Sequence, residues 1–233
     1  MNIKRLPVHI TQMKDLSPSS REVTLGLPEP LGFLPGAFVN VFMTHEGQRM
    51  RRAYSVSSDN STQNEISLSI RKGSAGGMSE RFWDEDIQHL PLEIMGPLGV
   101  NTVDKITTTR VFLFAFGIGV SVIKGLLPSL LRRDDITQVT ILTGSRSEVE
   151  ILYKDFFQEI AAQDARVEVR CVVSQPADVS YSLIGHIHDH VKDLDFRNST
   201  VYLCGPKKAC ESLQKVIEMQ TNPAPQFLIE AFD

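Results

Sequence analysis

Residues 111–131 read VFLFAFGIGVSVIKGLLPSLL, and this stretch decides how the second half of the chain folds. Its first six residues form a continuous apolar run of the kind that is buried on both faces of a parallel β-sheet. Glycines follow at positions 117 and 119, and the residues from Val120 to Arg133 favour a helix. A strand, a tight glycine turn and a helix in this order predict the first unit of an α/β domain.

The same order of strand and helix recurs towards the C-terminus. Because strands that alternate with helices need right-handed crossover connections, the region is expected to form a parallel sheet. The further strands are expected at 139–145 (VTILTGS), 167–174 (VEVRCVVS), 200–206 (TVYLCGP) and 226–232 (QFLIEAF), and the helical segments at 148–162, 186–191 and 208–219.

Towards the N-terminus the pattern is different. Short segments rich in β-branched and aromatic residues alternate with turn-forming clusters between Pro7 and Ile94, which predicts an antiparallel barrel or sandwich. A helical stretch is expected at 79–84, with Ser79 capping its first turn. The expected strands are 8–11 (VHIT), 21–27 (REVTLGL), 37–43 (AFVNVFM), 53–58 (AYSVSS) and 66–72 (ISLSIRK).

The change of pattern places a domain boundary between Val100 and Ile106. The 233 residues suit two compact domains, each with its own core. We therefore expect a β + α/β chain, with an antiparallel β-barrel domain at residues 1–104 and a parallel-sheet α/β domain at residues 105–233.

Composition narrows the classes of function. With 28 acidic against 24 basic residues and a net charge of −4, the chain has no broad cationic field, so nucleic-acid binding is not expected. The N-terminus lacks the apolar core of a signal peptide, and the run from Val111 to Val122 is too short to span a bilayer. We expect a cytoplasmic protein that does not insert into a membrane.

We expect no metal centre in this chain. Its three cysteines, Cys171, Cys204 and Cys210, are not spaced for zinc or an iron–sulfur cluster, so redox chemistry would need another cofactor. The alternating histidines in 186–190 (HIHDH) would share a face only on a strand, and a solvated helix start is the favoured interpretation there.

Arg52-Ala53-Tyr54-Ser55 lies on an expected strand, where alternate side chains reach the same face. A guanidinium suits a pyrophosphate, an aromatic ring suits a flat heterocycle, and a hydroxyl can bond a ring nitrogen. The segment therefore outlines a flavin site, although an exposed strand with a partly buried tyrosine fits the same residues.

Gly76-Gly77-Met78-Ser79 follows at the expected helix start. Small residues there leave backbone amides open to a phosphate, so the segment is a candidate phosphate site. A glycine turn capped by serine is the structural alternative.

These motifs in this order resemble the flavin domain of the ferredoxin–NADP reductase superfamily, and the cytochrome b5 reductase-like branch is the most similar. The residues that carry the resemblance are RAYSVSSDN at 52–60, GGMSERF at 76–82 and GPLG at 96–99. The second half continues it with the glycine turn at 116–121, TGSR at 143–146, CGP at 204–206 and EAF at 230–232, so the resemblance covers essentially the whole chain.

The resemblance implies an FAD-binding barrel followed by a nicotinamide-binding domain, with hydride passing from the nicotinamide C4 to the flavin N5. It implies that Arg52 pairs with the flavin phosphates, Tyr54 stacks on the isoalloxazine, and Ser55 lies near N5. Ile70 and Lys72 contact the flavin through their backbones. The implied flavin-binding residues are Arg52, Ala53, Tyr54, Ser55, Ile70, Lys72, Gly77, Met78 and Ser79, the last three at the pyrophosphate.

For the dinucleotide, the resemblance implies close backbone approach at the glycine turn and a cysteine beside the nicotinamide. At the C-terminus, Phe232 would shield the flavin and Glu230 would relay a proton or contact an acceptor, whereas frayed terminal residues are the alternative. A buried structural cysteine is the alternative for Cys204. The implied dinucleotide-binding residues are Gly117, Gly119, Ser121, Arg146, Cys204, Gly205, Pro206 and Phe232, and the implied catalytic residues are Ser55, Cys204, Glu230 and Phe232.

Two positions depart from the family pattern. Phe116 stands where a second glycine is usual and Val122 where a proline is usual, which bears on the pose of the dinucleotide. Ser174 matches a serine that is frequent in NADPH users, but Gln175 replaces a frequent arginine. The reductant is therefore written as NAD(P)H, either NADH or NADPH.

The main functional expectation is an FAD-dependent NAD(P)H oxidoreductase that passes electrons to a separate acceptor, such as a ferredoxin, a haem protein or an oxygenase component. One alternative is an NAD(P)H:flavin reductase that uses flavin as a diffusible substrate, suggested by the variant turn GIGVSVI. The other is a non-catalytic electron-transfer or regulatory subunit, suggested by Phe116 and Val122.

Overall fold

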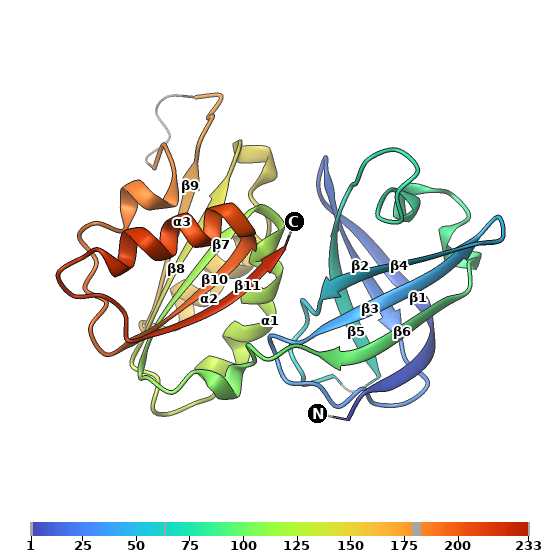
Figure 1. Cartoon of the computed structure of the whole chain (residues 1–233), viewed down its shortest axis with the longest axis horizontal. Helices are drawn as coiled ribbons and strands as arrows, with labels where there is room; N and C mark the ends of the chain where they lie inside the picture. Colours follow the sequence, from blue (N-terminus) through green and yellow to red (C-terminus); the bar gives the residue numbers. More distant parts are fainter. Residues whose placement is uncertain (1, 63, 179–182, 233) are drawn as a thin grey trace. The chain divides into compact units, whose positions relative to one another are not determined.

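The computed structural model describes residues 2–62, 64–178 and 183–232. The chain forms two compact units. Unit 1 comprises the residues up to Val103 together with Lys124–Ser129, and unit 2 comprises Asp104–Ile123 and the residues from Leu130 onward. Each is shown in Figure 1 with its strands and helices labelled.

Unit 1 is built on six antiparallel strands in the order β4-β3-β6-β1-β2-β5. A bridge between Val56, just after β4, and Leu68 in β5 joins the two ends of this sheet and closes it into a barrel. The antiparallel barrel expected from the sequence is thus confirmed. The strands are β1 (Lys4–Ser17), β2 (Ser20–Gly26), β3 (Phe38–His45), β4 (Gln48–Ser55), β5 (Glu65–Arg71) and β6 (Leu92–Leu98).

The barrel core follows from strand alternation. On β3, Val39, Val41 and Met43 are at most 1% exposed, whereas Phe38, Asn40 and Phe42 between them are only partly buried. Since successive side chains on a strand point to opposite faces, the first set fills the interior and the second covers the outer face.

Two strands of the barrel differ from the sequence expectation. The first strand extends from Lys4 to Ser17, because its exposed polar residues continue the pairing with β2. β6 is not among the strands expected from the sequence, yet its Gly96 pairs with Lys4 of β1 and its Leu98 with Phe38 of β3. Pro97 is tolerated in this central strand because it falls where the pairing with β3 shifts register, as at a β-bulge.

Between β5 and β6 the chain forms two short 3₁₀ turns, η1 (Glu80–Trp83) and η2 (Ile87–His89). The helical stretch expected at 79–84 is therefore a single 3₁₀ turn. A third, η3 (Val103–Lys105), follows β6.

Unit 2 is a five-stranded parallel sheet in the order β11-β10-β7-β8-β9. The parallel α/β domain expected from the sequence is confirmed. Its strands are β7 (Arg110–Phe116), β8 (Gln138–Ser145), β9 (Val167–Val173), β10 (Ser199–Pro206) and β11 (Gln226–Phe232). Its helices are α2 (Lys154–Gln163) and α3 (Lys207–Glu218), with 3₁₀ turns η4 (Gly117–Gly119), η5 (Glu148–Glu150) and η6 (Ile187–His190). Helix α1 (Val120–Leu131) begins and ends in unit 2, and its middle residues, Lys124–Ser129, are grouped with unit 1.

The central strands are buried on both faces, as their apolar sequence predicts. One face carries Phe112 and Phe114 of β7, and these rings pack with Phe196 and with Leu213 of α3. Figure 1 shows α3 lying across the sheet of unit 2.

The second helical segment starts later than expected. The sequence predicts a helix over 148–162, but α2 begins at Lys154, after the separate turn η5. Tyr153 adopts a left-handed conformation with φ of 56°, which interrupts the helical path. In the described part of the chain, no helix is both long and apolar enough to cross a membrane.

Candidate functional site

The motif Arg52–Ser55 forms the second half of β4, at an edge of the barrel sheet in unit 1. Arg52 and Tyr54 stand opposite the interior residues Val41 and Val39 of β3, so they share one face of the sheet. Arg52 and Ala53 are exposed, Ser55 is half-buried, and Tyr54 is 7% exposed.

Tyr54 connects β4 to the glycine-rich segment. Its hydroxyl lies 2.8 Å from the hydroxyl of Ser79, and its ring contacts Phe82 edge-on with centroids 6.0 Å apart. Burial raises the pKa of the Tyr54 phenol, with the Ser79 hydrogen bond and Arg52 acting in the opposite direction. Two residues 25 positions apart, both assigned to the flavin by sequence, are thus in direct contact.

The prediction that Ser79 caps a helix is wrong. Ser79 precedes η1, but its side chain makes no capping hydrogen bond, and its backbone is helical rather than extended as an N-cap usually is. The physical reason is competition, because the Ser79 hydroxyl bonds the Tyr54 hydroxyl instead.

The backbone of the glycine-rich segment has specific hydrogen bonds. The Gly76 amide donates to the Glu80 carboxylate at 2.6 Å, and the Gly77 amide donates to the Ser74 carbonyl at 3.0 Å. Among the described residues, no acceptor is found for the Met78 and Ser79 amides. Met78 and Ser79 are themselves buried, at 6% and 2% exposed, and Arg52 is exposed. Two adjacent unpaired amides and a guanidinium are groups that suit the phosphates of a dinucleotide.

Ile70 and Lys72 lie at the end of β5 and just after it. Ile70 is fully buried in the barrel core. The Lys72 amide donates to the Ser19 carbonyl at 2.8 Å. A backbone contact of Lys72 with a ligand would therefore use its carbonyl oxygen.

In unit 2, the glycine turn η4 connects β7 to α1. Gly117 has φ of 55°, a conformation that favours glycine. A Cβ on Gly119 would lie 2.6 Å from the Cys204 carbonyl carbon and 3.0 Å from the Gly205 nitrogen, so this glycine lets the turn approach the end of β10. Ser121, in the first turn of α1, is 4% exposed.

Phe116 precedes this turn and points away from it. A Cβ on Gly205 would lie 2.7 Å from the Phe116 Cβ, and one on Gly144 would lie 3.7 Å from the Phe116 ring. Glycines on both flanking strands thus make room for the aromatic side chain. Val122 is 1% exposed within α1, so it is part of the packing of unit 2.

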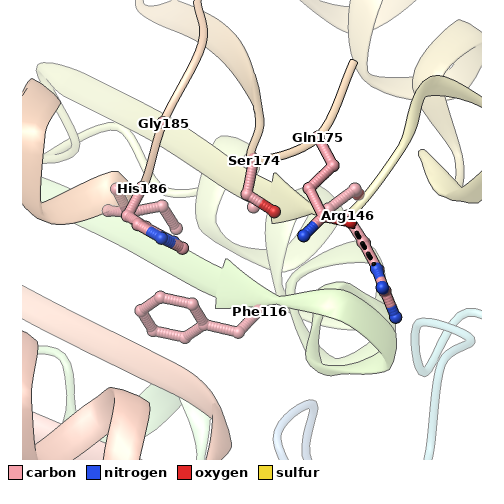
Figure 2. Close-up of a pocket in the computed structure, with 9 residues that line it drawn as sticks. Phe116, Arg146, Ser174, Gln175, Gly185 and His186 are labelled. Carbon is pink, nitrogen blue, oxygen red and sulfur yellow. Dashed lines mark hydrogen bonds between the residues drawn. The ribbon is translucent and has the colours of Figure 1, made fainter. Parts of the chain in front are cut away.

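A pocket of about 280 Å³ lies beside the ends of β7 and β8. Arg146 donates from Nε to the Gln175 side-chain oxygen at 2.8 Å, shown as a dashed line in Figure 2. Within the described residues, no carboxylate pairs with Arg146. The lining residues are Phe116, Gly144, Ser145, Arg146, Ser174, Gln175, Gly185, His186 and Ile187.

His186 contributes an imidazole to this pocket (Figure 2). It is the N-cap of η6, where the Asp189 amide donates to the His186 carbonyl at 2.9 Å and the Asp189 carboxylate accepts from the His186 amide at 2.9 Å. The pocket therefore combines a guanidinium, hydroxyls, an amide and two flat rings.

The histidine segment is, as expected, the start of a helical turn. The sequence interpretation left His186 as solvated, however, and missed its place in the pocket. The signal was Gly185-His186 ahead of a turn at the C-terminal side of a parallel sheet, where ligands commonly bind. His188 packs near Phe116, with ring centroids 6.2 Å apart, and burial lowers its pKa.

CGP ends β10, with Cys204 and Pro206 pairing in register with Glu230 and Phe232 of β11. The Cys204 side chain is fully buried. Burial raises its thiol pKa well above the ordinary value, and the Glu230 charge adds to this. The thiol is thus protonated at neutral pH. Cys204, Gly205 and Pro206 do not belong to the lining of the Arg146 pocket.

Comparison with known proteins assigns each half of the chain. Residues 7–102 match the family described as the oxidoreductase FAD-binding domain, and residues 113–215 match the oxidoreductase NAD-binding domain. The two matches follow one another along the chain, as the resemblance of the motifs leads one to expect.

Curated relatives include the phenol hydroxylase P5 protein of Acinetobacter pittii, 28% identical over 204 residues, which cover 84% of this chain and 57% of that protein. Ferredoxin–NADP reductase B of Sorangium cellulosum is 26% identical over 187 residues, covering 79% of this chain and 76% of the relative. The chain thus spans little more than half the length of the phenol hydroxylase protein.

Solved structures share the fold. The Amycolatopsis cytochrome P450 reductase GcoB has a TM-score of 0.87 and 24% identity, over 99% of this chain and 70% of that one. A ferredoxin NADP⁺ reductase from Neisseria gonorrhoeae with bound FAD and NADP has a TM-score of 0.81 and 16% identity, over 99% of both chains. The fold, the order of the motifs and both family matches lead to one assignment: the chain belongs to the ferredoxin reductase-like family of FAD- and NAD-binding oxidoreductases.

Proposed function

We propose that this protein is an FAD-dependent NAD(P)H oxidoreductase that takes hydride from the nicotinamide C4 onto the flavin N5 and passes electrons to a separate acceptor. The observation that carries the proposal is the pair of successive family matches, each falling on a unit with dinucleotide-binding features of its own. We propose residues 1–104 as the FAD domain and 105–233 as the NAD(P) domain.

On the flavin side, the proposal assigns the isoalloxazine to Tyr54 and Ser55, and the pyrophosphate to Arg52 and the segment from Gly77 to Ser79. The support is chemical. Among the described residues, Arg52 is exposed with no carboxylate partner, and the Met78 and Ser79 amides have no acceptor. Charge-assisted hydrogen bonds of this kind are the strong ones in phosphate recognition.

On the nicotinamide side, we assign the pyrophosphate to the turn at Gly117–Gly119 with Ser121, and the adenosine half to the Arg146 pocket. A flat ring fits beside Phe116 and His186, and a phosphate or ribose hydroxyl fits beside Arg146 and Ser174. Because Phe116 points away from the turn, it does not stand against this binding mode.

When bound, FAD supplies a centre that accepts two electrons as hydride and can release them singly. The chain's contribution is then mainly to hold the reacting groups in place. In this proposal the Cys204 thiol, neutral at its raised pKa, is a packing and hydrogen-bonding group beside the nicotinamide, not a nucleophile. Ser55, Glu230 and Phe232 complete the proposed catalytic set.

The acceptor is proposed to be a separate protein. Curated relatives carry names such as phenol 2-monooxygenase, reductase component, and toluate 1,2-dioxygenase electron transfer component. A cytoplasmic location remains part of the proposal and agrees with the three cysteines being free thiols, which reducing compartments favour.

The direct test is to purify the protein, add FAD and pass it through gel filtration. A yellow protein that retains FAD supports the proposal, and a protein that takes up no flavin contradicts it. A protein that loses FAD on the column but reduces free flavin with NAD(P)H would be the diffusible-flavin reductase. Bound FAD that no nicotinamide reduces would identify a non-catalytic subunit.

A further inference from the structure

The turn η1, with the glycine-rich segment from Gly73 to Ser79 before it, is hydrogen-bonded to the barrel at each of its two sides. At the N-terminal side, the Ser79 hydroxyl bonds the Tyr54 hydroxyl of β4. At the C-terminal side, Arg21 of β2 donates to the Phe82 carbonyl, and the Phe82 and Trp83 side chains pack with the barrel core. Arg21 itself lies outside the flavin motifs.

Arg21 makes three contacts with one guanidinium. Its Nη1 donates to the Phe82 carbonyl at 2.8 Å, its Nε donates to the Asp15 carboxylate at 2.6 Å, and its Cζ lies 5.0 Å from the centre of the Trp83 ring. The Arg21 side chain is 17% exposed, whereas Asp15 is 66% exposed. The guanidinium is therefore held mainly by η1, with Asp15 as the outer partner.

This geometry suits a rigid connection. A guanidinium is planar and presents its donors in a fixed fork, so binding a carbonyl, a carboxylate and an aromatic face together fixes its orientation. Lys72 adds a second cation 5.7 Å from the Trp83 ring. Trp83 is half-buried and packs against the barrel core.

The segment held in this way contains the open amides of Met78 and Ser79, which lie four and three positions before Phe82. Loops rich in glycine lose much conformational freedom when they become ordered on a ligand. A loop that is already attached at both ends has less to lose, so it binds more tightly.

We propose that Arg21 is a positioning residue for the pyrophosphate of FAD, which fixes η1 so that the Met78 and Ser79 amides stay in place as donors. This inference rests on the proposed flavin site. It gives the protein a means of favouring a flavin dinucleotide over a flavin without a pyrophosphate, through a residue on another strand.

The test compares FAD with riboflavin, which carries the isoalloxazine but no phosphate. Titration of the apoprotein, followed by flavin fluorescence, gives a dissociation constant for each. In Arg21→Gln, we expect the constant for FAD to rise about tenfold, as for the loss of a hydrogen bond to a charged group, and that for riboflavin to stay within about twofold. Arg21→Lys keeps the positive charge but lacks the planar guanidinium, so its dissociation constant for FAD is expected to lie between those of wild type and Arg21→Gln.

Arg5 provides a matched control. It also donates to a carboxylate, Glu93, at 2.6 Å and lies 4.9 Å from an aromatic ring, that of Phe42, but it has no contact with η1. Arg5→Gln is expected to leave both constants unchanged. Thermal unfolding of each apoprotein verifies that the variant is folded. If Arg21→Gln is not folded, the comparison is made with Arg21→Lys.

Equal weakening of FAD and riboflavin in the Arg21 variants would show a merely structural role and overturn the proposal, as would FAD binding equal to that of wild type. Wild-type protein that binds neither flavin would instead refute the proposed function itself, and this inference with it. The two failures are therefore distinct.

Discussion

Gly119 in the turn η4 offers the sharpest test of how unit 2 is built. Replacing it with alanine adds one methyl group, which would lie 2.6 Å from the Cys204 carbonyl carbon and 3.0 Å from the Gly205 nitrogen. The Cys204 carbonyl oxygen is nearer still, and ordinary contact begins at 3.4 Å, so the turn and the end of β10 must separate by about 1 Å. Both neighbours are backbone atoms of a buried strand, which cannot rotate away.

The size of the effect follows from that separation. Overpacking in a rigid interior costs about 1–3 kcal/mol, which for a domain of this size lowers the melting temperature of unit 2 by roughly 3–10 °C. A displacement near 1 Å at a binding turn can cost up to about a hundredfold in binding or rate. We therefore expect Gly119→Ala to raise the dissociation constant for NAD(P)⁺ by about tenfold to a hundredfold.

Calorimetry measures both quantities on the same preparation. Gly47→Ala is the control, because Gly47 has φ of 76° but no atom within 4 Å of its added Cβ. It should cost about 1 kcal/mol through backbone strain and leave dinucleotide affinity unchanged. Two results would show that close packing at Gly119 is not the cause. One is that Gly119→Ala keeps the stability and dinucleotide affinity of the wild type, and the other is that both variants lose dinucleotide affinity equally.

Three further predictions concern charge and reactivity. Arg146→Gln should raise KM for NADH or NADPH about tenfold without changing FAD affinity, because the Arg146 guanidinium has no anionic partner among the described residues. Steady-state kinetics measures KM and a flavin titration measures FAD affinity. An unchanged KM would exclude the Arg146 pocket as the site of the dinucleotide. Asp195 has its pKa lowered to about 2 by Arg197, so its contribution to stability is present above the unfolded value near 4 and is lost as pH falls through about 2. Denaturant unfolding of Asp195→Asn against wild type should show a difference at pH 6 that disappears towards pH 2, and a difference that grows on acidification would have the wrong sign. In the folded protein, iodoacetamide should label Cys171 before Cys204, because Cys171 is partly exposed and Cys204 is buried. Mass spectrometry of the labelled peptides shows which cysteine reacts first, and early labelling of Cys204 would contradict its burial.

The sequence was sufficient for the architecture because both units have strong periodic signals. The apolar run at 111–116 identifies a buried parallel strand, and the β-branched segments before Ile94 identify antiparallel ones. Local interruptions were harder to predict. The delayed start of α2 depends on the left-handed Tyr153, which no local propensity requires.

The candidate site could be predicted where its residues are close in sequence. Arg52, Tyr54 and Ser55 share one strand, and the glycines of η4 share one turn, so spacing alone groups them. The Tyr54–Ser79 contact and the Arg21–Phe82 hydrogen bond join distant segments, and only the folded chain brings them together.

Phe116 shows why a departure from a motif has to be judged in three dimensions. In the sequence, Phe116 stands where the family pattern has a glycine, which argues against dinucleotide binding at the turn. In the fold, Gly144 and Gly205 on the neighbouring strands leave room for its ring, which becomes a wall of the Arg146 pocket. The compensation lies 28 and 89 positions away, beyond the reach of any local pattern.

The central claim is that nicotinamide reduces a flavin held by this chain. The most direct test is an anaerobic stopped-flow experiment in which FAD-loaded protein is mixed with NADH and, separately, with NADPH, while the visible flavin absorbance is followed. We predict that at least one of the two nicotinamides rapidly bleaches the flavin absorbance, and that the bleaching is slower in Gly119→Ala. Bound FAD that stays oxidised with both nicotinamides would contradict it.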